Sequence, residues 1–294
     1  MSTVINDTKK QQTGSVSCPV CFHHCELKEG QRGRCLARVC RDGKSRCDNY
    51  GLLSSLALDP IEKKPLARFF PGSRILSVGS YGCNLHCPFC QNHEISHPAD
   101  LNSLKEQCRY VSPEELCALA EEYVPRGNIG VAFTYNEPLV GYEYVLDCAE
   151  LLHARGLKTV LVTAGLADKT VAEALRGKID AMNIDLKSFR EGFYTDLVRG
   201  DLETVKQFIR TAAEYAHVEL TKLIIPGEND SAEEMEEMAD WIASLPGGSD
   251  IPLHVSRFFP RYRMTDRPPT DTDLVYRLAD TARKKLRYVY TGNC

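Results

Sequence analysis

Three cysteines, at positions 83, 87 and 90, are the residues whose types and spacing are best suited to chemistry. A closed tetrahedral metal site takes four ligands, and this run supplies three thiolates. A cubane iron–sulfur cluster held by three thiolates keeps one iron open to a further ligand, and a reaction can take place there. The spacing therefore predicts a [4Fe–4S] cluster with an open iron on Cys83, Cys87 and Cys90.

A second set of cysteines lies nearer the N-terminus and has a different character. Its members are Cys18, Cys21, Cys25 and Cys35. Four thiolates complete a tetrahedral site without help, as in structural zinc, and the same four could hold an auxiliary iron–sulfur cluster. Residues 41–44 predict a hairpin turn in this stretch, and the flanking Cys40 and Cys47 could face each other. Zinc, an iron–sulfur cluster and no metal all remain open from the sequence.

Composition limits the classes of protein that this chain can belong to. Its 294 residues suit one large domain and a small addition. The 36 basic and 40 acidic residues give a net charge of −4, so nucleic acid is not an expected partner. Without a long apolar stretch or a signal-peptide pattern, we expect a cytoplasmic protein that does not enter a membrane. In a reducing compartment, 13 cysteines indicate metal ligands and buried thiols rather than disulfides.

From position 74 onward, short apolar runs alternate with amphipathic segments. Strands are predicted over 74–79, 129–134, 158–163, 181–185, 218–225 and 252–256. Helices are predicted from Ser112-Pro113 onward and over 141–155, 168–176, 201–215, 231–244 and 271–285. This alternation predicts a parallel sheet, in a barrel or in a doubly wound fold. The cysteine loop follows the first strand, at the edge where such folds place their chemistry.

These residues resemble the radical S-adenosylmethionine (radical SAM) superfamily, whose hallmark is the three-cysteine run. Phe89 matches the aromatic residue that members usually carry beside the adenine of SAM. Gly82 and the trailing Gln91-Asn92 are similar to the pyruvate formate-lyase activating enzymes. Runs 134–138, 254–258 and 290–293 resemble one subgroup, the radical SAM member of the AmmeMemoRadiSam system, which carries a similar N-terminal cysteine run.

The resemblance implies an α/β fold built on a partial (β/α)6 barrel that is open on one side. We expect a polar tail over residues 1–16, a cysteine-rich metal-binding ribbon over 17–60 and the barrel over 61–294. Residues 63–65 look like part of a linker.

Asn136 and Glu137 follow the second predicted strand, and their oxygens could accept protons from an ammonium group. They match the Gly-Gly-Glu-Pro motif that binds the amino group of SAM, although Tyr135 and Asn136 replace its glycines. Thr163, after the third strand, matches a residue that bonds the carboxylate or ribose of SAM. A helix-initiating loop and an ordinary turn are the structural alternatives.

The fourth strand ends in Asn183, Asp185 and Lys187, which alternation places on one face. In the activating enzymes, the corresponding Asp and a nearby residue help to hold a monovalent cation beside SAM, so the resemblance makes Asp185 and Asn183 candidates. Val162 stands where the family has a second acidic ligand, so the cation site could be incomplete. Lys187 could contact an anionic substrate or form a structural salt bridge.

Thr221, on the fifth strand, and His254, on the sixth, are further candidates for the SAM pocket. The resemblance places both near SAM, while a lone histidine on a strand is as often a core residue.

The resemblance implies an enzyme that reductively cleaves SAM to a 5′-deoxyadenosyl radical, which abstracts hydrogen from a substrate. That substrate is a glycyl radical protein or a small molecule, and the electron donor is a protein such as flavodoxin or ferredoxin. Cleavage of another SAM bond, giving an aminocarboxypropyl radical, is a variant. The alternative is a metal-stabilised binding or scaffold protein in which both cysteine sets are structural and His86 or His93 completes the site on Cys83, Cys87 and Cys90.

Overall fold

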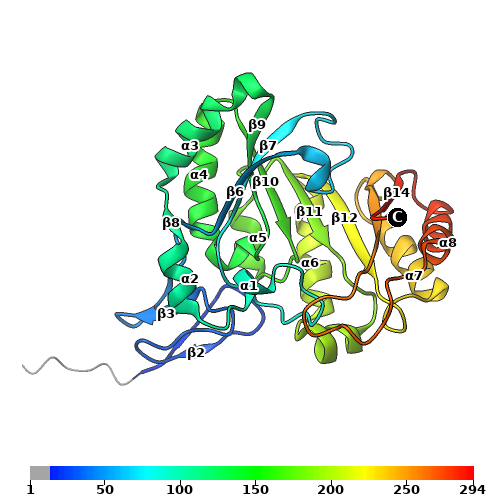
Figure 1. The fold of residues 1–294 in the computed structure, drawn as a ribbon, viewed down its shortest axis with the longest axis horizontal. Helices are drawn as coiled ribbons and strands as arrows, with labels where there is room; N and C mark the ends of the chain where they lie inside the picture. Colours follow the sequence, from blue (N-terminus) through cyan, green and yellow to red (C-terminus); the bar gives the residue numbers. More distant parts are fainter. Residues whose placement is uncertain (1–13) are drawn as a thin grey trace, which may run out of the picture.

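A twisted sheet of eight strands forms the centre of the computed structural model, which describes residues 14–294 (Figure 1). Its strand order is β14-β13-β12-β11-β10-β9-β7-β6. The parallel strands are β7 (Arg74–Gly79), β9 (Asn128–Phe133), β10 (Lys158–Thr163), β11 (Ala181–Asp185), β12 (His217–Ile224), β13 (Leu253–Arg257) and β14 (Val289–Gly292). All six predicted strands are confirmed. The edge strands β6 and β14 do not pair, so the sheet is a partial barrel as expected.

Helices follow the parallel strands and cover the outer face of the sheet (Figure 1). They are α3 (Pro113–Glu122), α4 (Tyr142–Ala154), α5 (Lys169–Ala174), α6 (Leu202–Ala213), α7 (Ala232–Ala243) and α8 (Thr272–Arg283). The N-cap side chain of every one except α4 accepts a backbone hydrogen bond, and Ser112 forms the predicted capping box with Glu115. Within residues 14–294, no helix has the length and apolar character needed to cross a bilayer.

Shorter elements complete the chain around this sheet. They are α1 (His93–Ser96), α2 (Leu101–Gln107), β5 (Leu52–Leu53), β8 (Arg109–Tyr110), the 3-10 turns η1 (Ile61–Lys63), η2 (Val124–Arg126), η3 (Pro138–Gly141) and η5 (Gly248–Asp250), and the π-helical η4 (Phe193–Val198).

The N-terminal ribbon contains two small hairpins, β1 (Val16–Ser17) with β2 (Glu26–Leu27) and β3 (Arg38–Arg41) with β4 (Lys44–Cys47). Asp42 and Gly43 both have positive φ, which confirms the predicted turn. Cys40 and Cys47 do not face each other, because their thiols contact Glu29 and Asn49 respectively.

Two boundaries differ from the sequence prediction. Residues 55–60, expected in the ribbon, form β6 (Ser55–Pro60), which pairs antiparallel with β7 in the main sheet. The polar tail was expected to reach residue 16, but Val16 already belongs to β1; positions 1–13 lie outside the described residues.

The segment after β6 fills the inside of the partial barrel. Ile61 and Leu66 pack against Ile75, Ala132 and other buried residues on the concave face, Val160 and Ala181. Lys64, expected in a linker, is buried, and its ammonium donates to Asp59 at 2.9 Å. We call residues 61–73 the inner segment. It is part of the barrel core rather than a linker.

A buried carboxylate anchors the inner segment to β12. Glu219 accepts hydrogen bonds from the backbone N–H groups of Ala67 (2.9 Å) and Arg68 (2.7 Å). The rings of His217 and His254 lie 2.9 and 2.6 Å from its two oxygens. Burial alone would raise the pKa of Glu219, but these partners lower it to about 2.

Glu219→Gln should lower the free energy of unfolding by about 3 kcal/mol at pH 7. The reason is that the folded protein stabilises the ionised carboxylate of Glu219 more than water does in the unfolded chain, and the variant loses this difference. The pKa of Glu219 is depressed on folding, so its contribution is complete above the ordinary value of 4.5 and is lost as the pH falls toward 2. Urea unfolding measured between pH 7 and pH 2 should therefore show the difference between wild type and variant shrinking below pH 4.5.

The matched control is Glu122→Gln, which alters an exposed carboxyl. It should change the unfolding free energy by less than about 0.5 kcal/mol at every pH. A difference between Glu219→Gln and wild type that did not depend on pH would contradict the role given to the carboxylate.

Candidate active site at the cysteine loop

The three predicted cysteines gather on the loop of residues 80–92, between β7 and α1. The thiols of Cys87 and Cys90 lie near enough to that of Cys83 for their negative charges, when deprotonated, to raise its pKa. The N–H of Leu85 donates to the sulfur of Cys83 at 3.4 Å, and Ser96 lies 3.8 Å from that of Cys90. Burial raises the pKa of Cys83 well above its ordinary value and that of Cys87 to about 12, so both are protonated until a metal displaces the protons.

The donor set fits a cubane cluster better than a single ion. Among residues 14–294, no three His, Cys, Asp or Glu side chains converge closely enough to hold one metal ion. A cubane is larger than one ion and needs its thiolates further apart. The rings of His86 and His93 stack on those of His97 (4.1 Å) and Tyr262 (4.2 Å), and Nδ1 of His93 lies 3.2 Å from the carbonyl oxygen of Cys90. Three thiols without a fourth protein ligand is the arrangement that the spacing predicted.

The side chain of Asn136 holds the start of the cysteine loop. Its Oδ1 accepts from the N–H of Ser80 at 2.9 Å, and its Nδ2 donates to the carbonyls of Tyr81 (3.2 Å) and Gly82 (3.0 Å). The sequence predicted that Asn136 receives the amino group of SAM. The structure instead uses this amide to join the end of β9 to the loop after β7.

Glu137 joins the ends of β9 and β10. One carboxylate oxygen accepts from the hydroxyl of Thr163 at 2.6 Å and from the N–H of Leu139 at 3.0 Å, and the other accepts from the N–H of Ala164 at 2.8 Å. Burial raises the pKa of Glu137, while these hydrogen bonds act in the opposite direction. Both predicted residues therefore lie beside the cysteine loop, with Glu137 near Cys83, but their side chains already bond other groups of the protein.

Asp185 and Lys187 form an ion pair at the end of β11, with 2.7 Å between Nζ and Oδ2. Burial alone would lower the pKa of Lys187, but Asp185 and Cys87 raise it well above its ordinary value. The Lys187 ammonium therefore lies close to the thiol of Cys87. The hydroxyl of the buried Tyr194 accepts from the N–H of Lys187 at 3.1 Å, a contact that no feature of the sequence indicated.

Three other predicted residues make a separate polar group on the concave face. Asn183 donates to the carbonyl of Pro65 at 2.8 Å and accepts from the hydroxyl of Thr221 at 2.9 Å. His254 is paired with Glu219. The amide of Asn183 therefore bonds the inner segment and β12, and a cation site on Asp185 and Asn183 stays a prediction.

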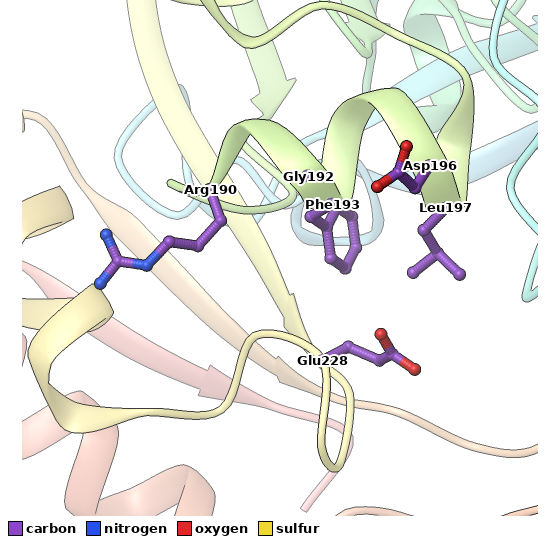
Figure 2. Close-up of a pocket in the computed structure, with 6 residues that line it drawn as sticks. All are labelled: Arg190, Gly192, Phe193, Asp196, Leu197 and Glu228. Atoms are coloured by element: carbon purple, nitrogen blue, oxygen red, sulfur yellow. The ribbon is translucent and has the colours of Figure 1, made fainter.

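A cavity of about 310 Å³ lies between η4 and the loop after β12 (Figure 2). Phe193 and Leu197 from η4 face Glu228, from the loop after β12, across this space. The ring of Phe89 lies 6.3 Å from that of Phe193, so the residue predicted beside the adenine of SAM borders the same region. The remaining lining residues are Arg190, Gly192 and Asp196.

The N-terminal ribbon packs directly on the cysteine loop, and the two lie together at one end of the sheet (Figure 1). Gly82 has φ +90°, and a Cβ on it would lie 2.4 Å from the carbonyl oxygen of Cys35. Asn49 donates to the carbonyl of Tyr81 at 2.8 Å. The residue before Cys83 must therefore be glycine, for its backbone angle and for its contact with the ribbon.

Gly82→Ala should lower the free energy of unfolding by about 3 kcal/mol, because it adds both backbone strain and a clash with the backbone of Cys35. It should also reduce the iron that the chain retains after anaerobic reconstitution. Gly127→Ala is the matched control, since Gly127 has φ +87° but open space around it. That variant should cost about 1 kcal/mol and keep its iron. Equal losses in the two variants would mean that the ribbon contact is unimportant.

Comparisons with known proteins agree with this geometry. The chain is 36% identical over 288 residues to an uncharacterized protein of Methanocaldococcus jannaschii, covering 97% of this chain and 83% of that protein. It is 25% identical over 187 residues to the pyruvate formate-lyase-activating enzyme of Clostridium pasteurianum, covering 62% and 75% of the two chains. The crystal structure of QueE from Escherichia coli shares the fold, with a TM-score of 0.51 and 14% identity over 83% of this chain and 93% of that one. The family model described as the radical SAM superfamily matches residues 77–242, and the chain belongs to that superfamily.

Proposed function

We propose that this chain is an enzyme that cleaves SAM reductively at a [4Fe–4S] cluster on Cys83, Cys87 and Cys90. The observation that carries the proposal is the gathering of three thiols on one loop, that of Cys87 buried and those of Cys83 and Cys90 partly buried, beside the ammonium of Lys187. When bound, the cluster and SAM supply one-electron transfer and homolysis of a sulfonium bond, giving methionine and a 5′-deoxyadenosyl radical that abstracts hydrogen from the substrate.

The chain's own residues position SAM and exclude water. Because the side chains of Asn136 and Glu137 are already bonded, we assign them to holding the ends of β9 and β10 rigid. The amino and carboxylate groups of SAM are then received by the backbone at these ends. Phe89 and the apolar wall made by Phe193 and Leu197 suit the flat adenine ring.

Lys187 supplies a fixed positive charge beside the thiolate ligands. Reducing the cluster adds a negative charge, and a buried cation nearby favours that state. Asp185 reduces this effect and keeps the ammonium in place through its ion pair. The pair therefore sets the reduction potential of the cluster.

Two classes of substrate agree with this site. The similarity to an activating enzyme supports a protein substrate on which a glycyl radical is formed. The cavity beside Phe193 is large enough for a small molecule with an apolar part and supports the second class. A glycine-centred EPR signal on a candidate partner protein selects the first class, and hydrogen transfer from a small molecule into 5′-deoxyadenosine selects the second.

Anaerobic reconstitution of the full chain, followed by dithionite and SAM, should yield methionine and 5′-deoxyadenosine in equal amounts by chromatography. Cys87→Ala should abolish both products, because the cluster loses one of its three ligands. Cys108→Ser, at a cysteine outside both sets, should leave the yield unchanged. A product carrying an aminocarboxypropyl group would reassign the bond that breaks. Iron held by the three cysteines without any cleavage of SAM would overturn the proposal.

Lys187→Met should lower the midpoint potential of the cluster by about 50 mV or more, because a buried positive charge near the thiolates is lost. Asp185→Asn should shift the potential in the opposite direction. An EPR-monitored redox titration measures both shifts. The control is Lys284→Met, at an exposed lysine, which should leave the midpoint potential unchanged. Shifts of the same sign in Lys187→Met and Asp185→Asn would contradict the electrostatic role of the pair.

A further inference from the structure

We propose that Cys18, Cys21, Cys25 and Cys35 hold a second [4Fe–4S] cluster, which passes electrons to the cluster on the cysteine loop. The proposal rests on the proposed function for the receiving cluster and adds a metal site, its cofactor class and its role.

The four ribbon thiols are close to one another. A Cβ on Gly33 would lie 3.7 Å from the sulfur of Cys25 and 3.8 Å from that of Cys35. Cys18 and Cys25, when deprotonated, lie near enough to Cys35 to raise its pKa. Cys35 and Cys18 have the same effect on the pKa of Cys21. The loop that carries Cys18, Cys21 and Cys25 is closed by a bond from the N–H of Cys18 to the carbonyl of Cys25 at 3.0 Å.

Hydrogen-bond donors already surround these sulfurs. The hydroxyl of Ser45 donates to Cys18 at 3.2 Å. Burial raises the pKa of Cys35 and of Cys21, while the nearby backbone N–H groups of Ala37 and Arg38 at Cys35, and of His23 at Cys21, act in the opposite direction. A neutral thiol is only a weak acceptor, whereas a metal-bound thiolate accepts such bonds well. The ribbon backbone is therefore shaped for thiolates, and so for a metal centre.

A cubane fits this set better than zinc. Zinc needs four sulfurs, each about 2.3 Å from one point. No group of three or more candidate ligands in residues 14–294 converges on a single ion in that way. The cysteines of the loop likewise do not converge on a single ion, and they belong to a superfamily defined by its iron–sulfur cluster. Four thiolates that surround a larger space suit a fully ligated [4Fe–4S] cluster.

Asn84 links the ribbon cysteines to the cysteine loop. It directly follows Cys83 in the chain, its Nδ2 donates to the carbonyl of Leu166 at 2.6 Å, and its own carbonyl lies 2.9 Å from Nε2 of His23, two residues after Cys21. The Oδ1 of Asn84 is buried and has no hydrogen-bond partner. On the other side, the carbonyl of Cys35 touches Gly82, the residue before Cys83. The residues on both sides of Cys83 therefore contact the ribbon, one at Cys35 and the other close to Cys21.

The electron balance is simple. An external one-electron donor, a low-potential flavin or iron–sulfur protein, reduces the ribbon cluster from the 2+ to the 1+ state. The ribbon cluster then returns to 2+ as it reduces the loop cluster from 2+ to 1+, and no atom moves. Cys25 is partly exposed, and Lys28, Arg34 and Arg46 are exposed basic residues on the same ribbon, so an acidic donor could dock there.

Metal content of the full-length chain tests the site. After anaerobic reconstitution, wild type should hold about eight irons and eight sulfides, corresponding to two cubanes. Both Cys83→Ala/Cys87→Ala/Cys90→Ala and Cys21→Ser/Cys35→Ser should keep about four, while Cys108→Ser should keep the full amount. Mössbauer spectra should assign the iron of the triple variant to a [4Fe–4S] cluster. The triple variant isolates the ribbon site even if the ribbon variant fails to fold.

Zinc or no metal in the triple variant would overturn this proposal and leave SAM cleavage by the loop cluster untouched. Four irons in that variant, with no SAM cleavage by wild type, would support the ribbon cluster and overturn the proposed function instead.

The relay itself is tested by freeze-quench EPR of the loop cluster, identified by its change on adding SAM. With a reduced flavodoxin as donor, the loop cluster in Cys21→Ser/Cys35→Ser should be reduced at least about ten times more slowly than in wild type. An unchanged rate in this variant would overturn the relay.

Discussion

The close contact between Gly82 and the carbonyl of Cys35 is the constraint on which the rest of the site depends. It leaves no room for a side chain before Cys83 and sets the ribbon directly against the cysteine loop. From the opposite side, the amide of Asn136 bonds the same loop at Ser80, Tyr81 and Gly82. A loop held on both faces cannot shift when a cluster changes charge, which keeps the three thiols in place. The ribbon and the barrel are therefore one functional unit, although the sequence separates them.

Three carboxylates, the buried Glu137 and Glu219 and the partly exposed Asp185, each have a different kind of partner. Glu137 accepts bonds from neutral donors, the hydroxyl of Thr163 and the N–H of Ala164. Asp185 is paired with Lys187, which places the one ammonium bonded to these three groups beside Cys87. Glu219 is bonded to two histidines and to the inner segment, far along the strand from the cysteine loop. The position of the Lys187 ammonium is thus fixed by Asp185, because a largely buried charge is stable only beside its partner.

Local patterns in the sequence predicted the strands and the helices, because apolar periodicity and capping residues are local, while the role of the cysteines as metal ligands stays a prediction. The partners of polar side chains are not local. Asn183 bonds Pro65, which is 118 positions away, and Asn136 bonds Ser80 across 56 positions. The strands β6 and β14 were missed because β6, with the sequence SLALDP, ends in a proline and borders a turn, and β14 has only four residues. Alternation correctly placed Asn183 on the concave face, but it could not reveal that the inner segment occupies that face.

The departure of this chain from the Gly-Gly-Glu-Pro motif has a structural explanation. Tyr135 has φ +72°, a left-handed conformation that glycine adopts readily and tyrosine does not. Its hydroxyl donates to Asp59 at 2.8 Å, and the ammonium of Lys64 lies 4.7 Å from the centre of its ring. The ring fits because the facing residue is Gly79, where a Cβ would lie 2.9 Å from it. Hydrogen bonding and cation–π attraction offset the backbone strain. Tyr135 therefore connects the motif to the inner segment. A substitution in that segment can thus change the position of Asn136 and Glu137 without contacting either residue.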